Sequence, residues 1–392
     1  MTENELKTRL KEVSQMLCET IGPRPTGSKA NQEAAAFCLK EFSSLGYQVE
    51  EQSFDCMDWQ NHGASLSVDG TKIEVAAANY SNDCNVKAEL VFAGSVGELK
   101  NLEAEDRILV IHSDLCKEPL MPKSMTFYNP EEHQEIIRLL EGKKPLAIIT
   151  CSFLEDVPAP IIEDGDFDIP CAVVSGNQKD LLLKAKSAEL KLDTRRHPST
   201  GKNVIATNAA KQPVVSFSAH LDTAANTPGA LDNASGVSTL LVLAWLIKET
   251  KADLPVEFVL FNGEDYYSTP GENLFMGMSL MAQDKSRKVA FNIDGVGLKD
   301  SPTSFSFYEC SDKLCESIRH SFESLQEIEP WPMGDHMLFA YSGVPAIAIT
   351  ASGIFDLVYS VMHTPADTLD LIDYDILTRL VLTLFEVTKK IG

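Results

Sequence analysis

The C-terminal half of the chain alternates between short apolar runs and polar turns. Continuous apolar runs bounded by turn residues are typical of strands that are buried on both faces of a sheet. Four such runs are Val214–Ser218, Val256–Phe261, Val289–Ile293 and Val344–Thr350. The segment Val237–Ile247 is apolar enough to form a largely buried helix. This alternation predicts an α/β fold.

The N-terminal segment is predicted to be helical and to lead into an edge strand. Leu6–Thr20 and Ala34–Phe42 have helical spacing, and Ser28 or Asn31 is placed to cap the second helix. Tyr47–Phe54 then alternates between apolar and polar residues, as an edge strand does. We assign these elements to the same domain as the C-terminal half.

From about Asp55 the pattern changes to short, closely spaced strand-like runs. Asp193–Gly201 (DTRRHPSTG) is polar and turn-rich, so we interpret it as a linker back to the main sheet, which Lys202–Thr207 rejoins as a strand. The sequence therefore predicts two domains: residues 1–54 and 195–392 form one, and residues 55–194 form a smaller, β-rich insert. The predicted strands of the insert are Ala64–Val68, Lys72–Val75, Ala88–Phe92, Ile108–Ile111, Leu146–Thr150 and Ala172–Val174, with a helix at Glu131–Leu140.

Length and composition are those of a globular protein with more than one domain. The chain has 392 residues, of which 44% are hydrophobic and 23% are charged. Its formal net charge of −23 makes the phosphate backbone of nucleic acids a poor partner. No apolar run approaches the ~20 residues that a membrane-spanning helix needs. Neither nucleic acid nor a membrane is therefore expected as a partner.

The N-terminus and the cysteines together predict a cytoplasmic location. The opening residues, MTENELKTRLKEVSQ, form a charged helical pattern without the apolar core of a signal peptide. The nine cysteines are scattered singly and form no Cys-x-x-Cys motif. This usage favours reduced thiols over disulfides or a structural zinc site.

Histidines and acidic residues follow the strand-like runs of the C-terminal half. In open α/β sheets, functional sites lie at the edge formed by the carboxyl ends of the strands. Imidazole and carboxylate groups are ordinary ligands of divalent cations such as zinc. The residues concerned are His220 and Asp222 after the first run, Asp232 in the motif DNASG, Glu264 and Asp265 after the second run, Asp294 after the third, and His363 beyond the fourth.

Each of these residues also fits a plainer role when it is considered alone. Asp232 fits a helix N-cap, Asp294 fits a turn residue, and the tripeptide His-x-Asp is common in surface loops. The metal-site hypothesis therefore rests on the whole ordered set.

That ordered set resembles the M28 family of co-catalytic zinc peptidases. The shared features are HxD, DNxSG, a Glu–acidic pair, a lone Asp and HTPADT, from about Val214 to the C-terminus. A weaker match is the N-terminal GPRPTGS, where Arg24 and Ser28 are expected to fix a loop. The resemblance implies a three-layer α/β/α zinc exopeptidase fold with a mixed, mostly parallel central sheet. It also implies that residues 55–194 form a protease-associated-like domain.

The resemblance further implies a role for each site residue. Glu264 is the expected general base, and Asp222 is expected to orient His220. A cis peptide bond is expected between Asp232 and Asn233. Two divalent metal ions, expected to be zinc, are implied, with Asp232 as the bridging ligand, His220 and Asp294 completing one ligand set, and Asp265 and His363 completing the other.

The chain departs from the family pattern at two positions. Asp265 stands where a glutamate is commoner, which places the ion nearer the backbone. Met362 stands where many relatives have a tyrosine that donates to the oxyanion, so Tyr359 is a candidate substitute and the donor stays open. Asp335 and His336 resemble the SDH segment of the family, near the site but not as ligands.

The implied function is that of an exopeptidase, and first of all an aminopeptidase acting on peptides with a free N-terminus. Three alternatives stay open: a glutaminyl-peptide cyclotransferase with a single zinc, a carboxypeptidase, and a non-catalytic binding scaffold of the same fold. Loss of Glu264 or of a ligand would signal the scaffold, and none is lost.

Overall fold

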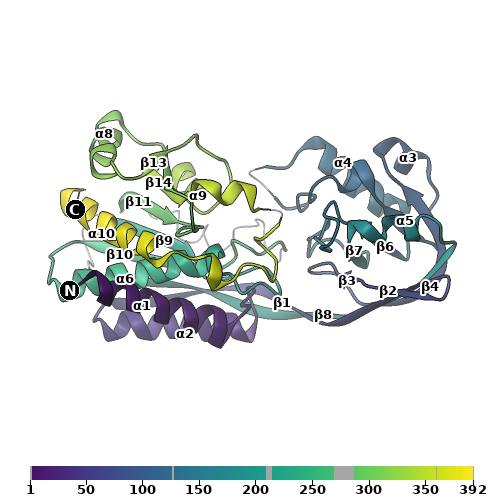
Figure 1. Cartoon of the computed structure of the whole chain (residues 1–392), viewed down its shortest axis with the longest axis horizontal. Helices are drawn as coiled ribbons and strands as arrows, with labels where there is room; N and C mark the ends of the chain where they lie inside the picture. The colour runs from purple at the N-terminus through teal and green to yellow at the C-terminus, as the bar shows by residue number, and fades with distance from the viewer. Residues whose placement is uncertain (1, 126–127, 209–213, 269–286, 359, 392) are drawn as a thin grey trace. The chain divides into compact units, whose positions relative to one another are not determined.

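The computed structural model describes residues 2–125, 128–208, 214–268, 287–358 and 360–391 (Figure 1). The chain divides into two compact units, which are described separately below. The first unit comprises Met1–Asp55, Thr200–Tyr266 and Phe275–Gly392, and the second comprises Cys56–Ser199 and Tyr267–Leu274. The boundaries expected from the sequence followed residues 54 and 194, whereas those of the structure follow Asp55 and Ser199.

The first unit is built on a mixed sheet. Its strand order is β13-β12-β14-β11-β9-β10-β8. β9 pairs in parallel with β10 and β11, and β11 pairs in parallel with β14, while the β8–β10 and β12–β14 pairs are antiparallel. The prediction of a mixed, mostly parallel sheet is confirmed. The strands are β8 (Ser187–Thr207), β9 (Val214–His220), β10 (Val256–Phe261), β11 (Arg287–Ile293), β12 (Thr303–Tyr308), β13 (Gln326–Glu327) and β14 (Ala346–Ala351).

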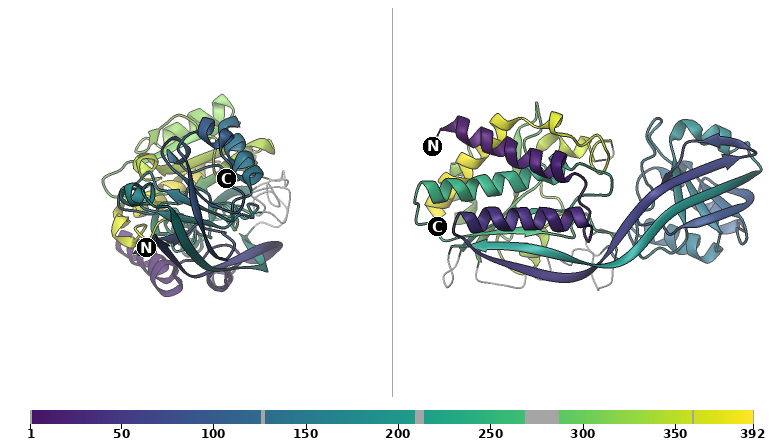
Figure 2. Two further views of the ribbon diagram at one scale, coloured as in Figure 1. Left: turned by 90° about the vertical axis from the view of Figure 1, so that its right-hand side faces the viewer. Right: turned by 90° about the horizontal axis from the view of Figure 1, so that it is seen from below.

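Helices cover both faces of this sheet, which confirms the three-layer architecture. On one face, α6 (Ser235–Glu249) packs against α1, α2 and α10, and Figure 2 shows α1, α6 and α2 side by side. On the other face, α9 (His336–Tyr341) packs against β11, β12 and β14. Among the described residues, the unit also contains α1 (Glu3–Gln15) with the π-helix η1 (Met16–Ile21), α2 (Lys29–Ser44), α8 (Asp312–Ser321), α10 (Tyr374–Ile391) and the short helices η4 (Ala230–Ala234), η5 (Ser352–Asp356) and η6 (Leu369–Leu371).

An aromatic stack fills the layer between the sheet and α2. Because side chains alternate along a strand, Phe258 of β10 faces this layer, whereas Phe261 of the same strand faces Phe339 of α9. The ring of Phe258 stacks on those of Phe42 and Phe217, with centroids 5.5 and 5.7 Å apart. Tyr47 meets Phe258 edge-on and donates its hydroxyl to the carbonyl of Ala244 at 3.1 Å.

The segment Ala230–Glu249, which contains α6, is apolar enough by length and composition to cross a membrane. An 18-residue window within it has a mean hydropathy of 1.5, but 94% of that window is buried within the structure. Burial on this scale is typical of the central helix of a globular domain. α6 itself, Ser235–Glu249, extends by two residues at each end beyond the helix predicted at Val237–Ile247.

The second unit contains a parallel sheet with its own core. β4, β5, β6 and β7 pair in parallel in that order, and β3 (Ala76–Ala77) adds antiparallel to β7. The helices α3 (Val96–Asn101) and α4 (Glu131–Lys143) pack against each other. Within the described residues, the unit also contains most of β1 (Gln48–Val68), which begins in the first unit, and β2 (Thr71–Ile73), β4 (Cys84–Ala93), β5 (Ile108–Ile111), β6 (Ala147–Cys151), β7 (Cys171–Val174), α5 (Lys179–Leu182) and the short helices η2 (Ser113–Cys116) and η3 (Gly176–Gln178).

The predicted linker Asp193–Gly201 is wrong, because these residues belong to the 21-residue strand β8. β8 pairs with β4 through Ser187–Leu192 and with β10 through Val204–Thr207, and it also pairs with β1. In the same way, the separate strands predicted at Tyr47–Phe54 and Ala64–Val68 are parts of the continuous β1. Pairing with distant strands here overrides a local composition that favours turns.

Replacing Phe258 with alanine should lower the free energy of unfolding of the first unit by about 3–5 kcal/mol, because the change leaves a cavity among three aromatic rings. Chemical denaturation followed by circular dichroism measures the loss. As a control, Glu33→Ala removes an exposed ion pair with Lys29 on α2 and should change stability by less than about 0.5 kcal/mol. Equal effects of the two substitutions would contradict the assigned core.

Candidate metal centre

The candidate site lies where the parallel strands of the first unit end. His220 is the last residue of β9, and Asp294 directly follows β11. Asp265 comes four residues after the end of β10, and His363 lies in the loop beyond β14. Because β9, β10, β11 and β14 run in parallel, their carboxyl ends share one edge of the sheet, as expected for a site in this fold class.

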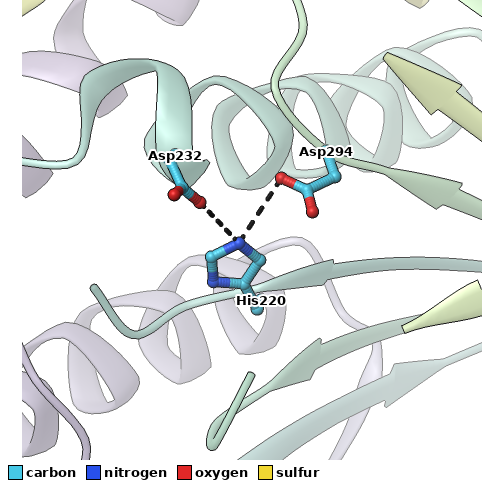
Figure 3. A group of neighbouring side chains, drawn as sticks. All are labelled: His220, Asp232 and Asp294. Atoms are coloured by element: carbon cyan, nitrogen blue, oxygen red, sulfur yellow. Dashed lines mark ion pairs between the residues drawn. The ribbon is translucent and has the colours of Figure 1, made fainter. Parts of the chain in front are cut away.

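One group of ligand atoms centres on His220 (Figure 3). Its Nε2 atom lies 2.9 Å from Oδ1 of Asp232 and 3.4 Å from Oδ1 of Asp294. The imidazole is directed between the two carboxylates, and the three ligand atoms lie within 4.8 Å of one another. This spacing suits coordination of a single cation.

A second group shares Asp232 with the first. Nε2 of His363 lies 3.3 Å from Oδ2 of Asp232 and 2.9 Å from Oδ1 of Asp265. The two carboxylate oxygens of Asp232 therefore face different histidines, one in each group. All five predicted ligands are brought together, and Asp232 occupies the position between the two halves of the set.

The donor atoms of the site fit a divalent cation. Nε2 of His220 and Oδ1 of Asp294 are buried, and neither atom has a hydrogen-bond partner within the described ranges. Burying such atoms without partners costs about 1–3 kcal/mol each. A zinc ion accepts imidazole nitrogen and carboxylate oxygen as ligands, so its binding would satisfy both atoms.

Asp222 lies behind His220, where the sequence analysis expected it. Its Oδ2 atom accepts hydrogen bonds from the hydroxyl of Thr26 at 2.8 Å and from the backbone N–H of Asp265 at 3.1 Å. The acceptor nearest to Nδ1 of His220 is the backbone carbonyl of Asp222 at 3.1 Å, while its carboxylate Oδ1 is 3.7 Å away. Donation from Nδ1 leaves the Nε2 lone pair directed at the site.

The DNASG motif positions Asp232 at the start of α6. The Asp232–Asn233 peptide is cis, as the family resemblance implied. The side chain of Asn233 donates to the carbonyl of Ile293 at 2.9 Å and accepts from the N–H of Gly236 at 3.0 Å. A Cβ at Gly236 would lie 2.4 Å from the carbonyl oxygen of Ile293, so only glycine fits. Asp232 is not the N-cap, because Ala234 occupies that position.

Charge and burial shift the pKa values of these groups strongly. Burial lowers the pKa of His220, but the carboxylates of Asp294, Asp222 and Asp232 outweigh it and raise that pKa well above its usual value. Burial also lowers the pKa of His363, but the carboxylates of Asp265 and Asp232 outweigh this effect and raise that pKa well above its usual value. Burial acts to raise the pKa of Asp232, but both histidines hold it below its usual range. The site thus attracts positive charge, and a bound cation would displace the protons of the histidines.

Glu264 is half-buried beside these groups. One of its carboxylate oxygens lies within 4.8 Å of ligand atoms of both His220 and Asp265. Burial raises the pKa of Glu264 well above its usual value, against the charge of His220, and the carboxylates of Asp265 and Asp335 raise it further. A carboxylate in such surroundings is suited to exchanging protons with a water molecule.

Two further acidic residues contribute to the site. The sequence analysis did not name Asp367 as a site residue, although it identified the HTPADT motif that contains Asp367. It accepts hydrogen bonds from the backbone N–H groups of Leu231 and Asp232 at 2.7 and 3.0 Å. Burial and the charge of Asp232 raise the pKa of Asp367 to about 6. Asp335, at the start of α9, is fully buried, and neither of its carboxylate oxygens has a hydrogen-bond partner in the part of the chain described.

Tyr359, the candidate oxyanion donor, lies outside the described residues, so the identity of the donor stays open. Met362 is half-buried and packs against the apolar core of the first unit. His336 is buried, with Nε2 3.1 Å from the carbonyl oxygen of Trp331, so it takes no direct part in the site.

Comparison with known proteins agrees with this geometry. Residues 203–388 match the family model described as peptidase family M28. Aminopeptidase YwaD of Bacillus subtilis is 26% identical over 393 residues, an alignment that covers 94% of this chain and 82% of that protein.

Solved structures share the fold. The structure of a zinc aminopeptidase from Bacillus subtilis superposes with a TM-score of 0.77 at 22% identity, covering 98% of this chain and 94% of the other. A glutaminyl cyclase from Porphyromonas gingivalis superposes with a TM-score of 0.53 at 14% identity, covering 100% and 99%. The matched range contains all the predicted ligands and Glu264, so residues 203–388 belong to peptidase family M28, and the solved structures share the fold of the chain.

Proposed function

We propose that this protein is a zinc aminopeptidase that removes N-terminal residues from peptides and uses two metal ions per chain. The proposal rests on the position of Asp232, whose two carboxylate oxygens face His220 on one side and His363 on the other. A carboxylate between two ligand sets is the arrangement that a pair of ions requires. The similarity to aminopeptidase YwaD supports the choice of reaction.

The proposed ligand sets give each ion three protein ligands. His220, Asp294 and Asp232 would hold one ion, while Asp265, His363 and Asp232 would hold the other. Three protein ligands leave a position open at each ion, as catalytic zinc sites do. When bound, the ions supply positive charge beside the scissile carbonyl and lower the pKa of water.

Glu264 acts as the general base in this proposal. Its carboxylate accepts a proton from the attacking water and then donates it to the leaving amine of the peptide. Its raised pKa and its position beside both ligand sets support this role. Asp222 keeps His220 in the tautomer whose Nε2 atom faces the site.

The charge balance of the site favours a substrate with a free α-amine. Five carboxylates, those of Asp222, Asp232, Glu264, Asp265 and Asp294, face about four positive charges from two divalent ions. The slight excess of negative charge suits an ammonium or amine better than a C-terminal carboxylate, which arginine usually binds. Arg24, the arginine behind the site, is fully buried and donates to backbone carbonyls.

We also propose a cellular compartment for the protein and a domain type for its second unit. None of the nine cysteines, all of which lie in the described ranges, forms a disulfide bond, which supports a reducing compartment such as the cytoplasm. The second unit is proposed to be a protease-associated-like domain, since its strands β5, β6 and β7 lie at the predicted strands Ile108–Ile111, Leu146–Thr150 and Ala172–Val174.

Metal analysis tests the proposed number of ions. The purified protein is expected to hold two zinc ions per chain by plasma emission spectroscopy. Dialysis against a chelator should abolish peptidase activity, and added zinc should restore it. A fixed stoichiometry of one ion, with cyclisation of N-terminal glutamine in place of peptide cleavage, would instead support the glutaminyl-peptide cyclotransferase.

Glu264→Gln should keep both ions but reduce turnover by about 10²–10⁴-fold, because the amide cannot accept the proton of water. Steady-state kinetics and metal analysis of the same sample measure the two effects. The control Glu249→Gln, at the exposed end of α6, should behave like the unmodified protein. A near-normal rate in Glu264→Gln with both ions retained would show that another group is the base.

N-terminal acetylation of a peptide should abolish its cleavage, whereas C-terminal amidation should have little effect. The reason is that the amine, and not the carboxylate, is expected to enter the negative site. Mass spectrometry of the products from matched free, acetylated and amidated peptides provides the measurement. Cleavage that survives acetylation but is lost on amidation would identify a carboxypeptidase.

A further inference from the structure

The segment Pro228–Asp232, which leads into the cis peptide, is held through its backbone on two sides. Its carbonyl groups face Arg24, whose Nη1 donates to Pro228 at 2.8 Å and whose Nη2 donates to Gly229 at 3.1 Å. Its N–H groups face Asp367, whose two carboxylate oxygens accept from Leu231 and Asp232. The positively charged guanidinium of Arg24 thus binds the carbonyl oxygens of the segment, and the negatively charged carboxylate of Asp367 binds its N–H groups.

Arg24 also holds the turn that follows His220. Its Nε donates to the carbonyl of Leu221 at 2.7 Å, and its backbone N–H donates to the hydroxyl of Thr223 at 3.0 Å. One guanidinium therefore joins the turn behind His220 to the segment that carries Asp232. These two segments supply the ligands of the group drawn in Figure 3, apart from Asp294.

Both side chains are completely buried, with 0% of either exposed. A buried charge is costly unless its hydrogen-bonding groups are satisfied. Arg24 meets this condition with backbone carbonyls, and Asp367 meets it with backbone N–H groups. Substituting either residue would therefore release a defined part of the loop.

Gly229 permits the close approach of Arg24. Its φ angle is +63°, and a Cβ there would lie 2.5 Å from the carbonyl oxygen of Asp232 and 3.2 Å from Nη2 of Arg24. A side chain at this position would displace the guanidinium or the loop. The conformation of the segment and the position of the arginine thus depend on each other.

We propose that Arg24 and Asp367 are positioning residues of the metal centre, which together direct the two carboxylate oxygens of Asp232 toward the two ion sites. We name this pair the Arg24–Asp367 clamp. Neither side chain is a ligand, and both act through the backbone around Asp232 and His220. The inference rests on the proposed metal-dependent function.

The test compares zinc affinity in two variants and a matched control. Arg24→Lys keeps the charge, but one ammonium cannot replace the three side-chain nitrogens that bind Leu221, Pro228 and Gly229. Asp367→Asn keeps the shape, but its NH₂ group would face an N–H donor. Arg287→Lys is the control, because Arg287 is also a buried arginine, paired with Glu257 at 2.7 Å, and lies at the opposite end of β11 from Asp294.

Competition with a fluorescent zinc chelator measures affinity, and thermal unfolding of the metal-free protein measures stability. Both clamp variants should bind Zn²⁺ about 10–100-fold more weakly than the unmodified chain, as changes behind metal ligands typically do. Arg287→Lys should lose thermal stability while keeping its zinc affinity. The double variant should lose less affinity than the two single losses combined, because both residues hold one segment.

The outcomes separate the clamp from the function on which it rests. If the unmodified chain binds zinc and both single variants bind it equally well, the pair is merely structural and the clamp is wrong. If the unmodified chain binds no zinc, the proposed function fails and the clamp fails with it. If Arg24→Lys does not fold, the zinc affinity of Asp367→Asn decides between the two outcomes, because this substitution is nearly isosteric and should leave the fold intact.

Discussion

Acidic side chains that are buried close together repel one another unless positive charge lies among them. The site of this protein depends on that constraint. Asp232, Asp265 and Asp294 converge on two histidines, with nitrogen–oxygen distances of 2.9–3.4 Å. These carboxylates stabilise positive charge and therefore raise the pKa values of both histidines. Two divalent cations would supply more positive charge to the site than two protons.

The surrounding structure must hold these carboxylates together against their mutual repulsion. Hydrogen bonds to the backbone of the first unit do this. Asn233 ties the start of α6 to the end of β11 through the carbonyl of Ile293, which directly precedes the ligand Asp294. Asp222 receives the N–H of Asp265, so the turn after β10 is tied to the turn after β9. Each ligand-bearing loop is therefore bonded to another, and none is positioned by its own sequence alone.

The same fold occurs in a zinc aminopeptidase and in a glutaminyl cyclase, so the fold by itself does not decide the reaction. The side chains at the sheet edge carry the distinction. Here the His220–Asp294 side is complete, and Asp232 faces both histidines. A complete second ligand set favours the hydrolytic reaction with two ions over a reaction with a single ion.

The sequence by itself determined the central strands and the candidate ligands that meet at their carboxyl ends. β9, β10, β11 and β14 were predictable because parallel strands buried on both faces read as continuous apolar runs. The ligands were predictable because parallel strands end at one edge, so residues such as His220 and Asp294, far apart along the chain, must lie near each other.

Only the tertiary structure decided the features that depend on partners distant in the sequence. Residues 193–201 have the composition of a linker, yet they continue the strand β8, which pairs with β4 before them, with β10 after them and also with β1. The burial of Asp335 and the meeting of Arg24 and Asp367 around one loop leave no periodic pattern in the chain. Residue type decides whether a side chain can donate or accept, but packing decides which distant backbone group it meets, so no local sequence signal records the partner.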